Sequence, residues 1–247
     1  MSKEHLEIGA QALPDLAGAV RDPGVTDLPE GYQYGVTRYA DLILKEAFPQ
    51  QFADLITTLQ EFKIELDELL RGGGSKSTMA RRFDAELQKR GWGKRTMTVS
   101  KLIDGKPVFD ARGHEIDMFA AKSSEEPYPG IALEMEWNNK APFFDRDLNN
   151  FAALHREGAL AIGVIITRGP ELQRIAGPVI KTSEKETSFK YGQSTTHWNK
   201  LIPRINLGGG GECPILVIGI EPGRIADFHL VRNAHSEGEN SDREQMC

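Results

Sequence analysis

The chain has 247 residues, 39% of them apolar and 27% charged, with a net charge of −6 and an isoelectric point near 5.6. This size and apolar content predict a soluble chain with one large or two small domains. Two cysteines, Cys213 and Cys247, are too few for a disulfide framework or a four-thiolate zinc site, which favours a reducing, cytoplasmic setting. The N-terminal residues lack the apolar core of a secretory signal, and no apolar run approaches ~18 residues, so neither secretion nor membrane spanning is expected.

The charge is unevenly distributed along the chain. Residues 71–112 contain 11 Lys/Arg against 4 Asp/Glu, and residues 173–206 contain 6 against 2. The intervening residues 113–172 reverse the balance, with 10 acids against 5 bases. Two basic segments therefore flank an acidic one, a pattern that is compatible with a nucleic-acid partner despite the negative total. The alternative is a solvated helix face, formed by Arg81, Arg82, Lys89 and Arg90.

The N-terminal part is predicted to be an irregular arm followed by helices. Residues 1–31 are rich in Pro, Gly and Asp and show no sustained periodicity. Apolar residues at three- and four-residue spacing predict a helix over 37–47, which Phe48-Pro49 ends, and a second helix over 50–70. A third is expected over 79–91, capped by Ser77 or Thr78.

The glycine run before this third helix, RGGGSKST, does not have the spacing of a phosphate-binding Walker loop. That motif needs Gly directly before the Lys and another Gly five residues earlier, whereas here Ser75 precedes Lys76 and Leu70 holds the earlier position. Nucleotide hydrolysis is therefore not expected. A flexible basic loop, in which Lys76 touches a nucleic-acid backbone, is favoured.

The second half of the chain is predicted to consist of strands with a helix among them. Residues 96–103 predict a strand closed by an Asp104-Gly105 turn, and 114–121 and 130–137 are short apolar runs that contain acids. Residues 143–158 have helical spacing, whereas 159–168 and 213–220 are nearly unbroken apolar runs typical of strands buried on both faces. We predict an α/β fold with a mixed central sheet flanked by helices, preceded by N-terminal helices, with a polar tail at 231–247.

Three acids within these apolar runs are the most informative feature: Asp117, Glu134 and Glu136. A buried carboxylate is costly unless it meets a cation or a metal. Glu134 and Glu136 are two apart and share a strand face, and Asp117 can lie opposite them if the two runs are neighbouring strands. Hard oxygen ligands select Mg²⁺ or Mn²⁺. The alternative is an exposed edge strand with both glutamates in water.

The order of these acids resembles the site of PD-(D/E)xK nucleases. The run GIALEMEWNNKAPFFDRDLNNF, followed by ALAIGVIITR and later by STTHWNKLIPRINLGGGGECPILVIGI, resembles the BamHI and BglII branch of type II restriction endonucleases. Two residues depart from the general motif: Ile116 replaces a Pro, and Glu136 stands where Lys is common. An earlier ligand of that branch has no clear match, since Glu86 and Asp104 are weak candidates and are not assigned.

The resemblance covers about residues 70–220, and we predict one endonuclease domain over 32–230 with a restriction-endonuclease-like core at about 94–220. It implies a homodimer that cuts double-stranded DNA at a short palindrome with a GATC core and leaves 5′-phosphates. Asp117 and Glu134 would hold Mg²⁺, with Mn²⁺ as a substitute, and Glu136 would accept a proton from water or complete the metal shell. We also expect a DNA methyltransferase in the same restriction-modification system. The expected location is the cytoplasm of a prokaryotic cell.

Two segments are candidates for DNA contact. Asn138 and Asn139 match the base-reading Asn/Ser positions of the resembled enzymes, with a turn-stabilising role as the alternative. Lys140 and Arg146 are candidate phosphate contacts, although Arg146 could instead pair with a neighbouring acid of its own helix. The second segment is a polar cluster with adjacent bases, made of Ser194, Thr195, Thr196, His197, Asn199, Lys200 and Arg204.

Two other functions remain open from the sequence. A repair or structure-selective nuclease could use the same core, and a DNA-binding module without catalysis could keep the fold. The presence of all three acids argues against the second of these, and fold alone does not decide function.

Overall fold

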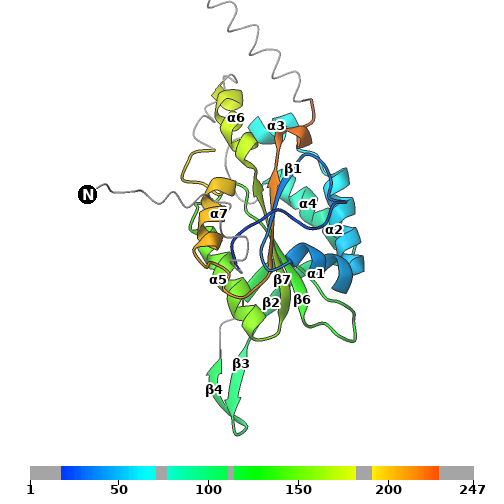
Figure 1. Ribbon diagram of the computed structural model, residues 1–247, viewed down its shortest axis with the longest axis vertical. Coiled ribbons are helices and arrows are strands. Elements are labelled where there is room, and N and C mark those ends of the chain that lie inside the picture. The colour runs from blue at the N-terminus through cyan, green and yellow to red at the C-terminus, as the bar shows by residue number, and fades with distance from the viewer. Residues whose placement is uncertain (1–17, 71–76, 111–113, 182–190, 228–247) are drawn as a thin grey trace, which may run out of the picture.

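The chain folds around one six-stranded sheet, seen in a computed structural model that describes residues 18–70, 77–110, 114–181 and 191–227 (Figure 1). The strand order is β1-β8-β7-β6-β5-β2. β6 and β8 run parallel to β7, whereas β5, β2 and β1 join through antiparallel pairs, so the predicted mixed sheet is confirmed. The strands of this sheet are β1 (Tyr32–Val36), β2 (Gly93–Met97), β5 (His114–Ala120), β6 (Gly130–Met135), β7 (Leu160–Arg168) and β8 (Ile215–Ile220).

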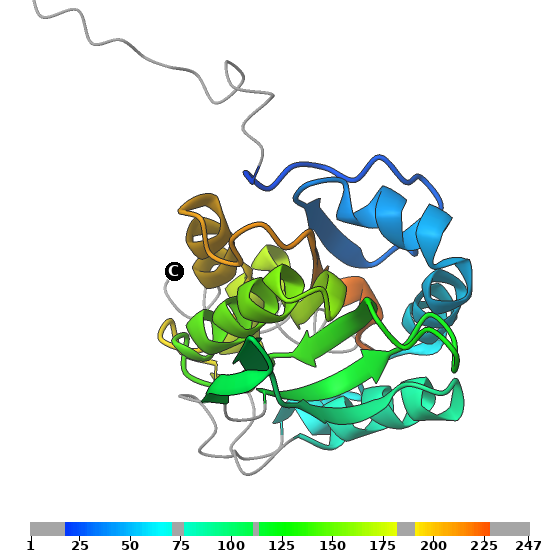
Figure 2. The ribbon, with the colours of Figure 1, turned by 90° about the horizontal axis from the view of Figure 1, so that it is seen from below.

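Helices cover both faces of the sheet (Figure 2). An apolar cluster of side chains fills the interface on each face. One face packs against the N-terminal helices α1 (Ala40–Ala47), α2 (Pro49–Glu61), α3 (Leu66–Leu70) and α4 (Thr78–Lys89). The other packs against α5 (Phe143–Arg156) and α7 (Trp198–Asn206). The remaining helices are α6 (Pro170–Lys181), which follows β7, and the short 3-10 turn η1 (Pro222–Arg224).

The alternation of side chains along β6 decides where its acids point. Ile131, Leu133 and Met135 belong to the cluster beneath the N-terminal helices, whereas Ala132 belongs to the cluster beneath α5 and α7. Because side chains alternate between faces, Glu134 shares the face of Ala132, and Glu136 continues it. All six residues of β6 are buried, so the exposed-edge alternative for this strand is wrong. The strand has neighbours on both sides.

The N-terminal helices differ from expectation in two respects, of which the smaller is that α1 begins at Ala40 and not at residue 37. The predicted single helix over 50–70 is wrong, because α2 ends at Glu61 and α3 starts only at Leu66. Phe62 is extended, and the backbone of Ile64 bonds instead to Arg224 and Ala226 next to η1. The backbone pairing of Ile64 with this distant segment therefore interrupts the helix, although the apolar side chains keep helical spacing. The predicted Ser77 cap of α4 is confirmed, since Ser77 Oγ accepts from Ala80 N at 3.2 Å.

A two-stranded hairpin projects from the body between β2 and β5 (Figure 1). It consists of β3 (Ser100–Ile103) and β4 (Lys106–Asp110), so the strand expected over 96–103 is divided between β2 and β3. Asp104 and Gly105 both have positive φ, 51° and 75°, and form the predicted turn. Both strands are exposed throughout, so the hairpin lies outside the core.

Residues 18–31 contain no helix or strand, only an isolated bridge between Arg21 and Val36. The remainder of the predicted arm, residues 1–17, and the predicted tail, 231–247, lie outside the described residues. Within the described residues, no helix has both the length and the apolar content needed to cross a membrane.

Candidate active site

Two adjacent strands bring the first two predicted acids together. Met118 of β5 pairs with Leu133 of β6, so Asp117 and Glu134, one step further along each strand, lie opposite one another. The backbone N–H of Asp117 donates to Glu134 Oε1 at 3.2 Å. Glu134 is only 5% exposed, whereas Asp117 is half-buried. The neighbouring-strand geometry expected from the sequence is therefore present.

Glu136, the third predicted acid, is held in place by its backbone and by its side chain. Its N–H donates to Ile166 O at 2.9 Å, and its carbonyl accepts from Thr167 Oγ1 at 2.7 Å, which fixes the residue against β7. Its carboxylate accepts from Asn139 Nδ2 at 2.6 Å and from Arg146 Nη2 at 3.4 Å. With 3% of its surface exposed, it lies at the base of the site.

A fourth carboxylate, Asp147 of α5, joins the three that the sequence indicated. It is 1% exposed, and its Oδ1 accepts from Arg146 Nε at 2.8 Å. Its Oδ2 is buried and has no hydrogen-bond partner within the described part of the chain. The sequence did carry a signal for it: Asp147 falls within the apolar stripe that Phe144, Leu148 and Phe151 form on the buried face of α5.

Burial and mutual repulsion shift the titration of these groups. Burial, followed by the charges of Asp147 and Asp117, raises the pKa of Glu134 to about 9. Burial and then the charge of Asp147 raise the pKa of Glu136 to about 8, and burial also raises the pKa of Asp147. Without a bound cation, the cluster therefore retains protons at neutral pH.

The donor set suits a hard divalent cation, since all four side chains offer carboxylate oxygens and Asp147 Oδ2 lacks a partner among the described residues. The oxygens are not already assembled around one point, because in the described ranges no three acidic, His or Cys side chains form a ready-made metal site. The weak candidates Glu86 and Asp104 do not join the cluster: Glu86 pairs with Lys89 at 2.5 Å, and Asp104 lies in the turn of the exposed hairpin.

The two candidate DNA-contact segments, about 55 residues apart, lie side by side in the structure. Thr196 N donates to Asn139 O at 2.8 Å, and Ala141 N donates to Ser194 O at 2.9 Å. Lys140 and Thr195 form an antiparallel bridge between these two bonds. We call residues 137–141 the first reading loop and residues 192–197 the second. They form one surface next to Glu136.

The candidate contact residues differ in exposure. Asn139, Lys140, Ser194 and Asn199 are exposed, whereas Asn138, Thr195 and Lys200 are half-buried. Thr196 and His197 are buried, and burial together with the charge of Arg168 lowers the pKa of His197 to about 4, which leaves its ring neutral. Both arginines have acidic partners, Arg146 with Asp147 and Glu136, and Arg204 with Asp145 at 2.9 Å. Lys76 lies outside the described residues.

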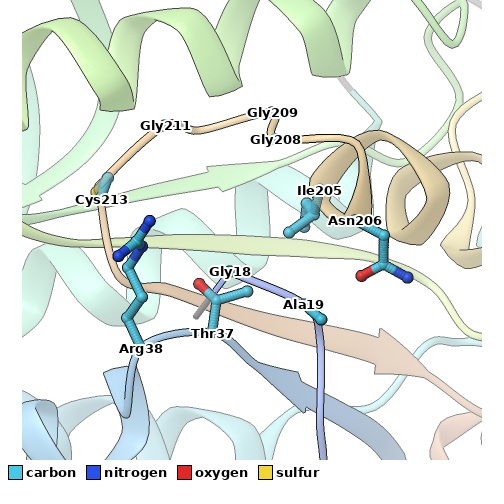
Figure 3. Close-up of a pocket in the computed structure, with 10 residues that line it drawn as sticks. All are labelled: Gly18, Ala19, Thr37, Arg38, Ile205, Asn206, Gly208, Gly209, Gly211 and Cys213. Carbon is cyan, nitrogen blue, oxygen red and sulfur yellow. The ribbon is translucent and has the colours of Figure 1, made fainter. Parts of the chain in front are cut away.

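A cavity of about 170 Å³ occurs elsewhere in the molecule, between the chain following β1 and the glycine-rich turn that precedes β8 (Figure 3). Thr37, Arg38 and Cys213 contribute side chains to it. Neither the carboxylates nor the reading loops line this cavity, so it does not mark the catalytic centre.

A mixed sheet whose adjacent strands present acids to one face, beside an exposed surface of amides and a lysine, defines the class of protein: a nuclease of the restriction-endonuclease type. Comparison with protein-family models matches residues 32–220 to the family described as Restriction endonuclease BglII/BglIII, and the chain belongs to that family. It is therefore a site-specific deoxyribonuclease, as the resemblance of its motifs predicted. A search of curated proteins found no match.

Proposed function

We propose that the chain is a Mg²⁺-dependent type II restriction enzyme that hydrolyses double-stranded DNA at a short palindrome, with a GATC core, and leaves 5′-phosphates. The observation that carries the proposal is that Asp117 faces Glu134 across β5 and β6, while Glu136 and Asp147 share the Arg146 side chain next to the paired reading loops. Its setting is a prokaryotic cytoplasm, with a DNA methyltransferase in the same system to protect the host sites.

Asp117 and Glu134 are the residues that would hold Mg²⁺, or Mn²⁺ in its place, because they face each other across β5 and β6. A divalent ion there supplies Lewis-acid stabilisation of the phosphate and a lower pKa for the attacking water. Asp147 adds negative charge from α5 at the same point. Its buried Oδ2, which has no partner among the described residues, offers a further oxygen to the ion or to a water in its shell.

Glu136 is placed to accept the proton of the attacking water. Asn139 and Arg146 both donate to its carboxylate, at 2.6 and 3.4 Å, and these two bonds would hold it in place beside the DNA backbone. A carboxylate held in this way would serve as a general base once a bound cation has displaced the proton that its raised pKa retains. Since Glu136 stands where Lys is common in the wider nuclease group, the cations near the phosphate would be Arg146, Lys140 and the bound metal.

Sequence reading would use the exposed amides and hydroxyls of the two reading loops. Asn139 and Ser194 are exposed on this surface, and Asn138 Oδ1 is a buried acceptor without a partner among the described residues. Asn side chains can pair bidentately with adenine in the major groove. The buried Thr196 and His197 would support the second loop from beneath, while Lys140, Lys200, Asn199 and the two arginines would contact the backbone.

A palindromic site calls for a two-fold symmetric reader, so we expect a homodimer. Light scattering of the purified protein, alone and with a DNA duplex that carries its site, should report twice the mass of one chain. A single-chain mass in both samples would contradict the dimer while leaving the nuclease assignment intact.

Cleavage of undamaged plasmid DNA distinguishes a restriction enzyme from a structure-selective nuclease. In Mg²⁺ the enzyme should convert an undamaged plasmid into a fixed set of fragments, and EDTA should stop the reaction. A matched pair of oligonucleotide duplexes, one intact and one with a mismatch or junction, serves as the control. Cleavage that requires the mismatch or junction would replace the restriction function with structure-selective cleavage, and binding without cleavage would indicate a DNA-binding module.

A further inference from the structure

Arg168, the last residue of β7, is a buried cation outside the catalytic cluster. Its side chain is 0% exposed, and no carboxylate among the described residues lies within ion-pair distance of it. It lies on the opposite sheet face from Glu134, with Ile162, Val164 and Ile166 of the same strand. A guanidinium without a counter-ion is unfavourable in such a position unless hydrogen bonds use its donors.

Each nitrogen of the Arg168 side chain has a hydrogen-bond acceptor. Nη1 donates to the carbonyl oxygen of Trp137 in the first reading loop, and Nη2 donates to Thr195 Oγ1 in the second at 2.6 Å. Nε donates to Gln173 Oε1 of α6 at 2.8 Å. One rigid planar group therefore connects both loops to each other and to the framework.

Two aromatic rings enclose the guanidinium. Its central carbon lies 5.6 Å from the ring centre of Trp137 and 4.9 Å from that of Tyr191, and the two rings meet edge to face at 79°. Tyr191 is itself held, because its hydroxyl donates to Leu69 O at 2.9 Å and its carbonyl accepts from Gln173 Nε2 at 3.0 Å. The three hydrogen bonds and the two rings together fix the position of the guanidinium.

We propose that Arg168 is a positioning residue that sets the relative placement of the two reading loops and thereby the sequence specificity of cleavage. The proposal rests on the proposed function, because it assumes that these loops read the DNA. Arg168 does not itself touch DNA, being fully buried. It acts through Trp137, two residues before Asn139, and through Thr195, which lies next to Ser194.

Lysine cannot replace Arg168 in this role. Its ammonium group keeps the charge, but it lacks the planar fork that reaches Trp137 O and Thr195 Oγ1 together. With one connection lost, the loops could shift relative to each other while the catalytic carboxylates, on the other face of the sheet, keep their places. Specificity should then fall more than the rate of the chemical step.

The test compares Arg168→Lys with wild-type enzyme on two duplexes, one carrying the mapped cognate site and one differing from it at a single base pair. We expect the ratio of kcat/KM for cognate over altered site to fall at least about tenfold, mainly through KM on the cognate duplex. Arg224→Lys is the matched control. Arg224 likewise donates to backbone carbonyls, those of Leu59, Gln60 and Phe62, and lies near Tyr32, but it contacts neither reading loop.

Thermal unfolding separates positioning from a general structural role. Arg168→Lys and Arg224→Lys should both lower the melting temperature, but only the first should lower the specificity ratio. An unchanged ratio for Arg168→Lys, in an enzyme that still cleaves, overturns the proposal. If Arg168→Lys does not fold, the specificity ratio is measured for Gln173→Met, which removes only the acceptor of Arg168 Nε and the bond to Tyr191 O. A lower ratio for Gln173→Met supports the proposal, and an unchanged ratio overturns it. Wild-type protein that cleaves neither duplex in Mg²⁺ would instead refute the proposed function.

Discussion

Glu134→Gln is expected to lower the rate of DNA cleavage in Mg²⁺ by at least about a thousandfold, because it removes a carboxylate that would hold the ion beside the phosphate. Binding of the cognate duplex, measured in Ca²⁺ or without metal, should persist, since Glu134 is only 5% exposed and is not one of the proposed DNA-contact residues. The volume of the side chain is nearly unchanged by the substitution. Cleavage at a rate within about tenfold of wild type would exclude Glu134 as a metal ligand.

The same variant should be more stable than the wild type at alkaline pH when metal is absent. Burial raises the pKa of Glu134 to about 9 in the folded protein. The contribution of its protonated form to the free energy of unfolding is therefore complete below about pH 4.5 and is lost as the pH rises toward 9. The amide introduced by Glu134→Gln cannot ionise, so the variant escapes this loss. In EDTA, the two melting temperatures should agree near pH 5 and diverge in favour of Glu134→Gln near pH 9.

Each kcal/mol of that difference corresponds to roughly 2–4 °C in a protein of this size. A parallel pH dependence of the two proteins would show that Glu134 ionises freely in the fold. Such a result would contradict the burial of this carboxylate, independently of any measurement of activity.

Asp147→Asn is expected to raise the Mg²⁺ concentration that gives half-maximal cleavage by at least about tenfold, because it deletes one buried negative charge near the ion's position. The pKa of Glu136 should also fall, since the charge of Asp147 is one of the causes that raise it. Titration of cleavage rate against Mg²⁺ at fixed pH measures the first effect.

Asp145→Asn is the matched control for this experiment. Asp145 lies on the same helix two residues earlier, but it is exposed and pairs with Arg204 instead of facing the cluster. Its substitution should leave the Mg²⁺ dependence within about twofold of wild type. If both variants raise the Mg²⁺ concentration for half-maximal cleavage equally, Asp147 acts only through the overall negative charge of the helix and does not belong to the metal site.

Much of this site could be predicted from the sequence because its strands are buried on both faces. Acids within apolar runs are conspicuous there, and the two-residue spacing of Glu134 and Glu136 determines their common face. Spacing left open whether β5 and β6 pair, because nine residues separate the two strands. The family resemblance supplied what spacing alone left open, namely that β6 is an interior strand instead of an exposed edge.

The remainder depended on tertiary contacts that local patterns do not encode. Asp147 falls within the apolar stripe of α5, but only the placement of α5 over the sheet shows which carboxylates it joins. The break after Glu61 arises from backbone pairing of Ile64 with residues beyond β8. The pairing of the two reading loops, and the part of Arg168 in it, join segments that α5, β7 and α6 separate in the sequence.

Sequencing the ends of plasmid fragments produced in Mg²⁺ tests the central claim most directly, since it reports activity, target and cleavage chemistry together. The account predicts that every end maps to one short palindrome, carries a 5′-phosphate and disappears when EDTA is present. Ends scattered over the plasmid without a common sequence, or cleavage that continues in EDTA, would contradict it.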